Sequence, residues 1–196
     1  MAKRAETSTP LHEVIAARWS PRALDPDTEV TERQLRALLE AARWAPSRGN
    51  TQPARYLVGR RGEPTFDRIL GTLERGNRNW AHRAGALLLA VAVTRNDKGE
   101  IPLYEYGVGL ASQNLVLQAV AEGLVAHQMA GFDADAARRE FGLPEHAQPL
   151  AAIAVGAQAE PESLDDDRLV QRERQPRSRH ALGEIAFTNT WGEPAF

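Results

Sequence analysis

The apolar run at residues 84–93 constrains the fold of this chain more than any other sequence feature. It is continuously apolar from residue 86, ends in Val-Ala-Val, and is closed by Thr94 and Arg95. An apolar run without polar alternation is typical of a strand that is covered on both faces. The run is far shorter than the ~20 residues that span a bilayer. The sequence therefore predicts a fully buried strand at residues 86–93.

The segments around this run alternate between helical and strand patterns. Thr31 and Gln34 have the spacing of a capping box, and apolar residues follow at helical spacing until Pro46. Residues 104–123 are so rich in apolar positions that they predict a long, deeply buried helix. Residues 124–130 show no clear period. Further helices are predicted at residues 11–19, 66–73 and 133–141, and strands at residues 55–59 and 150–155. This alternation favours an α+β fold with one central sheet.

The composition is that of one globular domain. The chain has 196 residues, of which 42% are hydrophobic and 26% charged. The net charge of -2 argues against a general nucleic-acid binder. The absence of cysteine excludes disulfides, zinc ribbons, iron–sulfur clusters and thiol nucleophiles. Residues 1–14 carry positive charge without the apolar segment of a signal peptide, and we expect a soluble cytoplasmic protein.

The common nucleotide and metal motifs are missing from the sequence. Gly107 and Gly109 resemble the start of a dinucleotide fingerprint, but Ser112 stands where the third glycine belongs. We interpret these glycines as positions where a buried helix approaches its neighbour closely. The five histidines are scattered, and we predict no metal site.

Two arginine-rich segments suggest an anionic ligand. The first lies at the end of the first predicted helix and contains Arg18, Ser20 and Arg22. The second lies near the C-terminus and contains Arg172, Arg174, Arg177 and Arg179. Guanidinium groups bind phosphate bidentately and stay charged. For the second segment the alternative is a solvated surface arm, and for the first it is a favourable interaction with the helix dipole. Residues 160–180, an acidic run followed by a basic one, are predicted to form an extended arm on a surface.

A proline-bracketed polar loop separates the second helix from the first strand. Its sequence is APSRGNTQP, which gathers Ser, Arg, Asn, Thr and Gln between two apolar elements. The loop is either a solvated turn or a segment that holds a polar, flat ligand.

These segments together resemble the FMN-dependent nitroreductase family. The matching segments, in the family's order, are RWSPR, APSRGNTQP, NRNW before the apolar strand, and PRSRHALGEI before NTWG. The segment LVAHQMAGFD also resembles the part of the family that passes the flavin ring. The resemblance extends over residues 11–191.

The resemblance implies a nitroreductase-like α+β sandwich with a central, mostly antiparallel sheet flanked by helices. It implies an intertwined homodimer with FMN at the interface. Residues 1–196 would form a single FMN-binding domain, in which residues 160–196 form a C-terminal arm that docks on the partner subunit. The expected chemistry is a ping-pong reaction. NADH or NADPH gives a hydride to flavin N5, and a small organic acceptor such as a nitroaromatic compound or a quinone then takes electrons. The resemblance implies neither a catalytic side chain nor a metal.

The resemblance also assigns residues to the FMN phosphate. Arg18 and Ser20 match residues that hold the phosphate and the ribityl chain. Arg177 and Arg179 match the C-terminal phosphate contacts. The loop at residues 46–50 matches the segment that meets the flavin from the other subunit.

The remaining assignments concern the flavin ring. Arg22 matches the cation near flavin N1 and O2, Asn77 matches the amide at the pyrimidine edge, and residues 129–131 match the backbone segment that faces N5 and O4. The full set of implied cofactor-binding residues is Arg18, Trp19, Ser20, Arg22, Pro46, Ser47, Arg48, Asn50, Asn77, Gln128, Met129, Ala130, Gly131, Arg177 and Arg179.

Two positions depart from the family pattern. Arg48 replaces the family's second serine, and Ala54 replaces its tryptophan. Arg48 forms a local salt bridge, or it reaches into the site and favours an anionic substrate or NADPH. Ala54 leaves room that a neighbouring chain could fill. The alternatives to a nitroreductase are a same-fold reductase or dehydrogenase of another small molecule, a flavin-binding protein without turnover, and a structural dimer without ligand.

Overall fold

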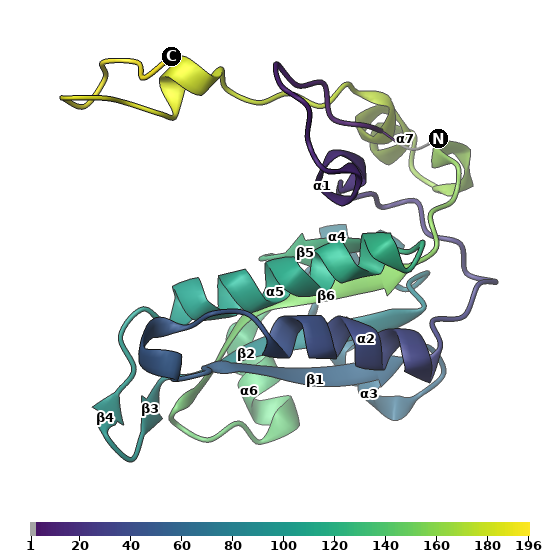
Figure 1. The fold of residues 1–196 in the computed structure, drawn as a ribbon. Coiled ribbons are helices and arrows are strands. Elements are labelled where there is room, and N and C mark those ends of the chain that lie inside the picture. The colour runs from purple at the N-terminus through teal and green to yellow at the C-terminus, as the bar shows by residue number, and fades with distance from the viewer. Residues whose placement is uncertain (1–2) are drawn as a thin grey trace.

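A four-stranded sheet forms the centre of the protein in the computed structural model, which describes residues 3–196 (Figure 1). The strand order is β1-β2-β6-β5, and each neighbouring pair is antiparallel. The strands are β1 Ala54–Arg60, β2 Ala86–Val93, β5 Val125–Met129 and β6 Ala147–Gly156. The central antiparallel sheet of the prediction is confirmed. The signal-peptide expectation concerned residues 1–14, of which the first two lie outside the described residues.

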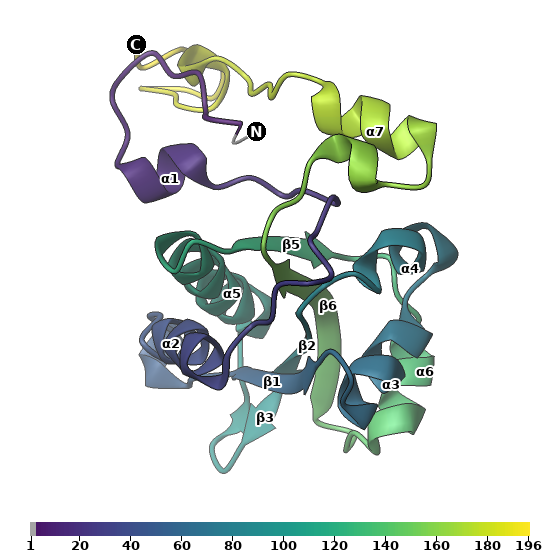
Figure 2. The same cartoon turned by 90° about the vertical axis from the view of Figure 1, so that its right-hand side faces the viewer.

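Helices cover both faces of this sheet (Figure 2). One face carries α2 Glu32–Arg43 and α5 Tyr104–Ala121, and the other carries α3 Pro64–Thr72, α4 Arg75–Ala81 and α6 Ala134–Phe141. A short hairpin, β3 Arg95–Asn96 and β4 Gly99–Glu100, extends from the end of β2.

The central strand β2 explains the apolar run of the sequence. Leu87 and Leu89 pack into the core on the α3, α4 and α6 side, whereas Leu88 and Ala90 pack into the core on the α2 and α5 side. All four are fully buried. Both faces of the strand are apolar because each contributes to a separate core. The prediction of a fully buried strand is confirmed.

The predicted caps also form. The Gln34 backbone N–H donates to Thr31 Oγ1 at 3.2 Å, and the Thr31 N–H donates to Gln34 Oε1 at 3.0 Å. This reciprocal pair satisfies two of the donors that a helix start leaves free. Asp133 caps α6 through the Ala136 N–H at 2.8 Å. Helix α2 ends at Arg43, before the proline that we expected to stop it.

The two chain ends lie together as a third layer beside the sandwich (Figure 1). This layer contains α1 Glu13–Ala17, η2 Pro161–Ser163, α7 Asp167–Arg174 and η3 Leu182–Glu184. The prediction of an extended arm at residues 160–180 is therefore partly wrong, because η2 and α7 are helical. The segment after α7 projects from the body, and its Trp191 is 91% exposed.

Candidate functional site

Three arginines from the two ends of the chain form a cationic cluster. Arg18 follows α1, and Arg177 and Arg179 follow α7. Burial, and then the nearby charges of Arg177 and Arg179, lower the pKa of the half-buried Arg18. Burial and the charge of Arg179 likewise lower the pKa of Arg177. Among residues 3–196 none of the three forms an ion pair. A cluster of cations without a counterion favours an anionic ligand.

Local hydrogen bonds fix two of these guanidinium groups. Arg18 Nη1 donates to Ser20 Oγ at 3.2 Å. Arg177 Nη1 donates to the backbone oxygens of Lys3 at 2.8 Å and Ala16 at 3.0 Å, which ties the C-terminal segment to α1. Arg179 Nη1 donates to its neighbour's backbone oxygen, and the side chain is exposed. The structure thus brings together the four residues that the sequence analysis assigned to a phosphate.

The side chain of Trp19 is engaged within the subunit. Its Nε1 donates to Gln158 Oε1 at 3.2 Å, and Lys3 Nζ lies 5.0 Å from the ring centroid. The ring packs between the N-terminal segment and the chain that leaves β6. The predicted contact of Trp19 with a cofactor stays a prediction.

A second group of predicted residues meets at the end of β5. Asn77 Nδ2 donates to the Gly131 backbone oxygen at 2.9 Å, and the Glu74 N–H donates to the same oxygen at 3.1 Å. A Cβ at position 131 would lie 2.7 Å from Asn77 Nδ2, so this close approach requires glycine. Met129 is buried, whereas Gln128 and Ala130 are exposed. Because an Asn amide has two N–H donors and an acceptor, this bond uses only part of its capacity.

His127 connects the two groups. Its Nδ1 lies 2.9 Å from the backbone oxygen of Pro21, and its ring centroid lies 4.7 Å from that of Trp80 in α4. The chain that carries Arg18 and Arg22 therefore contacts β5 at His127, four residues before Gly131.

Burial of His127 makes the protein sensitive to acid. Burial, and to a smaller extent the charges of Arg22 and Arg172, lower the pKa of His127 from 6.5 to about 4. The unfolded chain therefore binds this proton more readily than the folded protein does. The contribution to stability is complete above pH 6.5 and falls as the pH drops from 6.5 towards 4. We expect a loss of about 2 kcal/mol from this group between pH 7 and pH 5.

Denaturant unfolding of the His127→Gln variant tests this expectation. Glutamine keeps a donor for the Pro21 carbonyl but does not titrate. The stability of the variant should fall less between pH 7 and pH 5 than that of the wild type. His146→Gln, at an exposed histidine, is the matched control and should follow the wild type. Parallel curves for wild type and His127→Gln would contradict the expectation.

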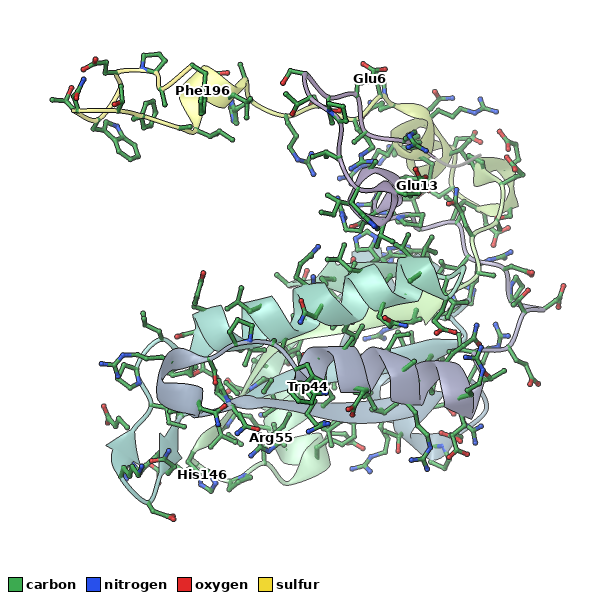
Figure 3. The ribbon with its side chains drawn as sticks, in the orientation of Figure 1. Glu6, Glu13, Trp44, Arg55, His146 and Phe196 are labelled. Atoms are coloured by element: carbon green, nitrogen blue, oxygen red, sulfur yellow. The ribbon has the colours of Figure 1, made fainter. Side chains whose placement is uncertain are left out.

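The polar loop at residues 46–53 lies in a different part of the subunit. Figure 3 places Trp44 and Arg55, which lie on either side of the loop, at the α2–β1 layer, and Glu13 of α1 in the terminal layer. The loop contains the short helix η1 Arg48–Asn50. Within one chain the structure therefore does not bring the loop to the arginine cluster.

The backbone of this loop is unusual. Asn50 has a φ of 55° and Gln52 a φ of 47°, and both follow Gly49 at 56°. A non-glycine residue in this region is uncommon and costs on the order of 1 kcal/mol, and such strain gathers at functional sites. The Gln52 N–H donates to Ser47 Oγ at 2.9 Å, which supports the turn. The loop thus has a defined backbone conformation, and its binding of a polar, flat ligand stays a prediction.

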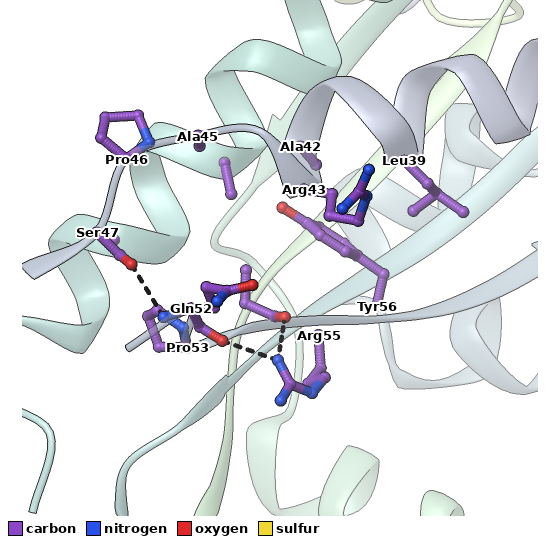
Figure 4. A pocket seen from close by; sticks show the side chains of 13 residues that line it. Leu39, Ala42, Arg43, Ala45, Pro46, Ser47, Gln52, Pro53, Arg55 and Tyr56 are labelled. Atoms are coloured by element: carbon purple, nitrogen blue, oxygen red, sulfur yellow. Dashed lines mark hydrogen bonds between the residues drawn. The ribbon is translucent and has the colours of Figure 1, made fainter. Parts of the chain in front are cut away.

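A cavity of about 280 Å³ lies behind the loop, between α2, β1 and α5 (Figure 4). Its walls include Ala54, Tyr56 and Leu39, so the position of the family tryptophan opens into this space. Arg55 Nη1 donates to two backbone oxygens at its rim, each at 2.8 Å. A Cβ at Gly107 would lie 2.8 Å from Pro53 Cγ, which confirms a close approach at this glycine. At Gly109 the same interpretation is wrong, because a Cβ there would have no neighbouring atom among the described residues within 4 Å.

Arg48 and the neighbouring loop residues Pro46 and Asn50 face solvent. The local salt bridge considered for Arg48 does not form among residues 3–196. The alternative, a reach towards an anionic substrate or NADPH, stays a prediction.

The sequence analysis missed two buried groups near the arginines. Glu173 in α7 is 1% exposed, and its Oε1 accepts the Arg22 N–H at 2.9 Å. His127 is the other. Neither has a local sequence signal, because each is buried by segments more than 100 residues away in the chain.

Residues 3–196 contain neither a metal-binding cluster nor a membrane-spanning helix. Among residues 3–196, no three His, Cys, Asp or Glu side chains gather closely enough to hold a metal ion. The helices of the same residues are too short or too polar to cross a membrane.

Comparison with known proteins gives consistent matches along the chain. The model of the Nitroreductase family matches residues 15–71 and 60–157. An uncharacterised 15.4 kDa protein of Mycolicibacterium smegmatis is 37% identical over 148 residues, which is 71% of this chain and 99% of that protein. A protein of Streptomyces coelicolor with the provisional name NADH dehydrogenase/NAD(P)H nitroreductase is 31% identical over 177 residues, 79% of this chain and 82% of its own.

Solved structures match over nearly the whole chain. An oxidoreductase containing FMN superposes with a TM-score of 0.89 at 29% identity, over 95% of each chain. A protein of Desulfovibrio desulfuricans in complex with FMN, provisionally described as a nitroreductase, superposes with a TM-score of 0.73 at 26% identity. That match covers 94% of this chain and 99% of the other.

Proposed function

Because this chain belongs to the nitroreductase family, we propose that it is an FMN-dependent oxidoreductase that uses NADH or NADPH as electron donor. Bound FMN would supply the redox chemistry in a ping-pong reaction, accepting hydride from NAD(P)H and reducing a small organic acceptor such as a nitroaromatic compound or a quinone. The protein's own residues bind the cofactor, orient it and tune its charge.

The arginine cluster is the observation that carries this proposal. The charges of Arg177 and Arg179 help to lower the pKa of Arg18, the charge of Arg179 helps to lower the pKa of Arg177, and Ser20 adds a hydroxyl beside Arg18. FMN phosphate carries up to two negative charges, which two or three guanidinium groups would neutralise. The cluster thus fits the phosphate end of FMN.

The end of β5 fits the other end of the same cofactor. Asn77 and the backbone at Gly131 offer hydrogen-bonding groups that could meet the pyrimidine edge of a flavin. Arg22 lies near His127 of β5, whose pKa its charge helps to lower, and in the proposed site the same charge would stabilise negative charge on the flavin pyrimidine. No metal is needed for this chemistry.

The polar loop completes the proposed site from a second subunit. Pro46, Ser47, Arg48 and Asn50 lie away from the arginine cluster of their own chain, yet the loop is strained and polar. A homodimer with two shared FMN sites reconciles these facts. The arm at residues 160–196 would dock on the partner, burying the apolar side chains of its exposed end.

We expect the purified protein to be yellow and to release FMN on denaturation. The arginine cluster offers cationic groups for one phosphate, and it offers nothing for the adenosine of FAD. Chromatography of the released flavin identifies the cofactor. A peak of FAD, or a protein that stays colourless after incubation with FMN, would contradict the proposal.

Stopped-flow mixing with NADH or NADPH then separates an enzyme from a flavin store. Loss of the oxidised flavin absorbance within the turnover time supports the oxidoreductase. Reoxidation by a panel of nitroaromatic compounds, quinones, enones and aldehydes then separates the nitroreductase from reductases of other small molecules. A flavin that NAD(P)H leaves oxidised would contradict the proposed electron donor.

A further inference from the structure

Glu173 is the most deeply buried charged side chain of the terminal layer. It lies in α7, a helix whose sequence is otherwise strongly polar, and it is 1% exposed. Burying a carboxylate is costly unless its oxygens find charged or hydrogen-bonding partners. The partners of Glu173 therefore indicate why this position is acidic.

Those partners belong to the proposed cofactor site. Glu173 Oε1 accepts the Arg22 backbone N–H at 2.9 Å and lies 3.7 Å from Arg22 Nη1. Its charge also acts on Lys3, whose Nζ bonds the Gln175 backbone oxygen just after α7. Glu173 Oε2 has no hydrogen-bond partner among the described residues. One carboxylate thus contacts Arg22 through both its main chain and its side chain.

The surroundings of this carboxylate are cationic. Burial and the charge of Arg172 lower the pKa of Arg22, whereas Glu173 opposes both effects. Arg18 and Arg177 are subject to the same mutual repulsion. Arg18 and Arg22 come from the N-terminal end of the chain and Arg177 and Arg179 from the C-terminal end, and Glu173 of α7 joins these two ends through its contact with Arg22. Its position and charge are therefore those of a group that holds the cations in place before a ligand arrives.

We propose that Glu173 is a positioning residue of the FMN site, which fixes Arg22 at the flavin ring through a buried hydrogen bond and ion pair. This inference rests on the proposed function. In this proposal Glu173 contacts Arg22 and acts on the cofactor only through it. It acts by holding the Arg22 side chain in one orientation. A binding site is more effective when neighbouring residues fix its ligand-contacting side chains in this way.

The midpoint potential of the bound flavin distinguishes positioning from other roles. A cation held near flavin N1 favours the reduced cofactor, so a displaced Arg22 shifts the potential to more negative values. If the charge of Glu173 acts on the flavin only through space, removing this negative charge shifts the midpoint potential to more positive values. A purely structural role lowers the melting temperature and leaves the potential unchanged.

A double-mutant cycle on the flavin-loaded protein isolates the coupling. The variants are Glu173→Asp, Glu173→Gln and Arg22→Ala, together with the two double variants. Aspartate keeps the charge but retracts the carboxylate by one methylene, so its through-space effect is nearly unchanged. We expect Glu173→Asp to shift the potential negatively when Arg22 is present and to have no effect in Arg22→Ala. The expected coupling is about tenfold in relative affinity for reduced and oxidised flavin, or about 30 mV for two electrons.

Glu162→Gln is the matched control for Glu173→Gln. Glu162 is also paired with an arginine of α7, Arg174, but both side chains are exposed. The control should not couple to Arg22→Ala. Titration of each apoprotein with FMN and a thermal melt accompany the potentials, so that a loss of folding is recognised.

The outcomes distinguish the positioning role of Glu173, the assignment of Arg22 and the proposed function. Equal shifts by the Glu173 variants in both backgrounds would overturn the positioning role and leave the proposed function intact. An unchanged potential in Arg22→Ala would overturn the assignment of Arg22 to the flavin ring, and the positioning role with it. A wild-type protein that binds no FMN would overturn the proposed function as well. If Glu173→Gln does not fold, Glu173→Asp gives the same test.

Discussion

Replacing Arg18 or Arg179 with alanine is expected to weaken FMN binding by roughly 1.5–3 kcal/mol each, or about 10- to 150-fold. The reason is the loss of a charge-assisted hydrogen bond to the phosphate from a cluster that has no other counterion among the described residues. The double variant should lose more than either single one, although the two effects need not add because the side chains are neighbours.

Titration of the apoprotein with FMN, followed by flavin fluorescence, measures these affinities. Arg36→Ala is the control, because Arg36 is exposed and paired with Glu32 at 2.7 Å on α2. Riboflavin, which lacks the phosphate, should bind wild type and Arg179→Ala alike. Wild-type affinity for FMN in both arginine variants would mean that these side chains are solvated surface, as the alternative interpretation of the C-terminal arginines states.

Deleting residues 181–196 is expected to loosen the dimer and to lower FMN occupancy together. The segment exposes large apolar side chains, including Ile185 at 63%, Trp191 at 91% and Phe196 at 89%. Such a surface commonly marks an interface. In Figure 3 Phe196 lies in the part of the chain that projects from the body. A ligand that binds only the assembled dimer also stabilises it by mass action.

Light scattering gives the mass, and the flavin absorbance of the same sample gives the occupancy. The deleted segment lies beyond Arg179, so the arginine cluster of each chain is retained. The double variant Trp191→Ser, Phe196→Ser tests the same contact without shortening the chain. A truncated monomer that keeps full FMN would show that each site lies within one subunit, and our interpretation of the polar loop would be wrong.

The elements that could be predicted are those whose pattern of buried residues can be recognised within a short stretch of sequence. Strand β2 is buried on both faces and therefore reads as an unbroken apolar run. Strand β5 lies at the edge of the sheet, with exposed Gln128 and half-buried His127, and it gave no period. Helix α4 was missed because only its last two residues, Trp80 and Ala81, are buried. Helix α7 was read as an extended arm because it buries only Val170 and Glu173.

The candidate site was predictable to the extent that the resemblance to a family reached individual residues. Arg18, Arg177 and Arg179 do gather, and Asn77 does meet Gly131. Their contacts with FMN, the dimer and the docking of the arm remain predictions. Glu173 and His127 could not be predicted, because their burial depends on contacts between segments far apart in the chain. Local spacing carries no information about such contacts.

The arginine cluster contains Arg18 from the N-terminal end of the chain and Arg177 and Arg179 from the C-terminal end. This separation along the sequence has a consequence for synthesis in the cell. A ribosome makes the first arginine early and the last two only after the whole sandwich has been translated. The nascent chain therefore has one of the three arginines for most of its time on the ribosome. If the cluster binds FMN as proposed, cofactor binding would be a late event that requires translation through Arg179.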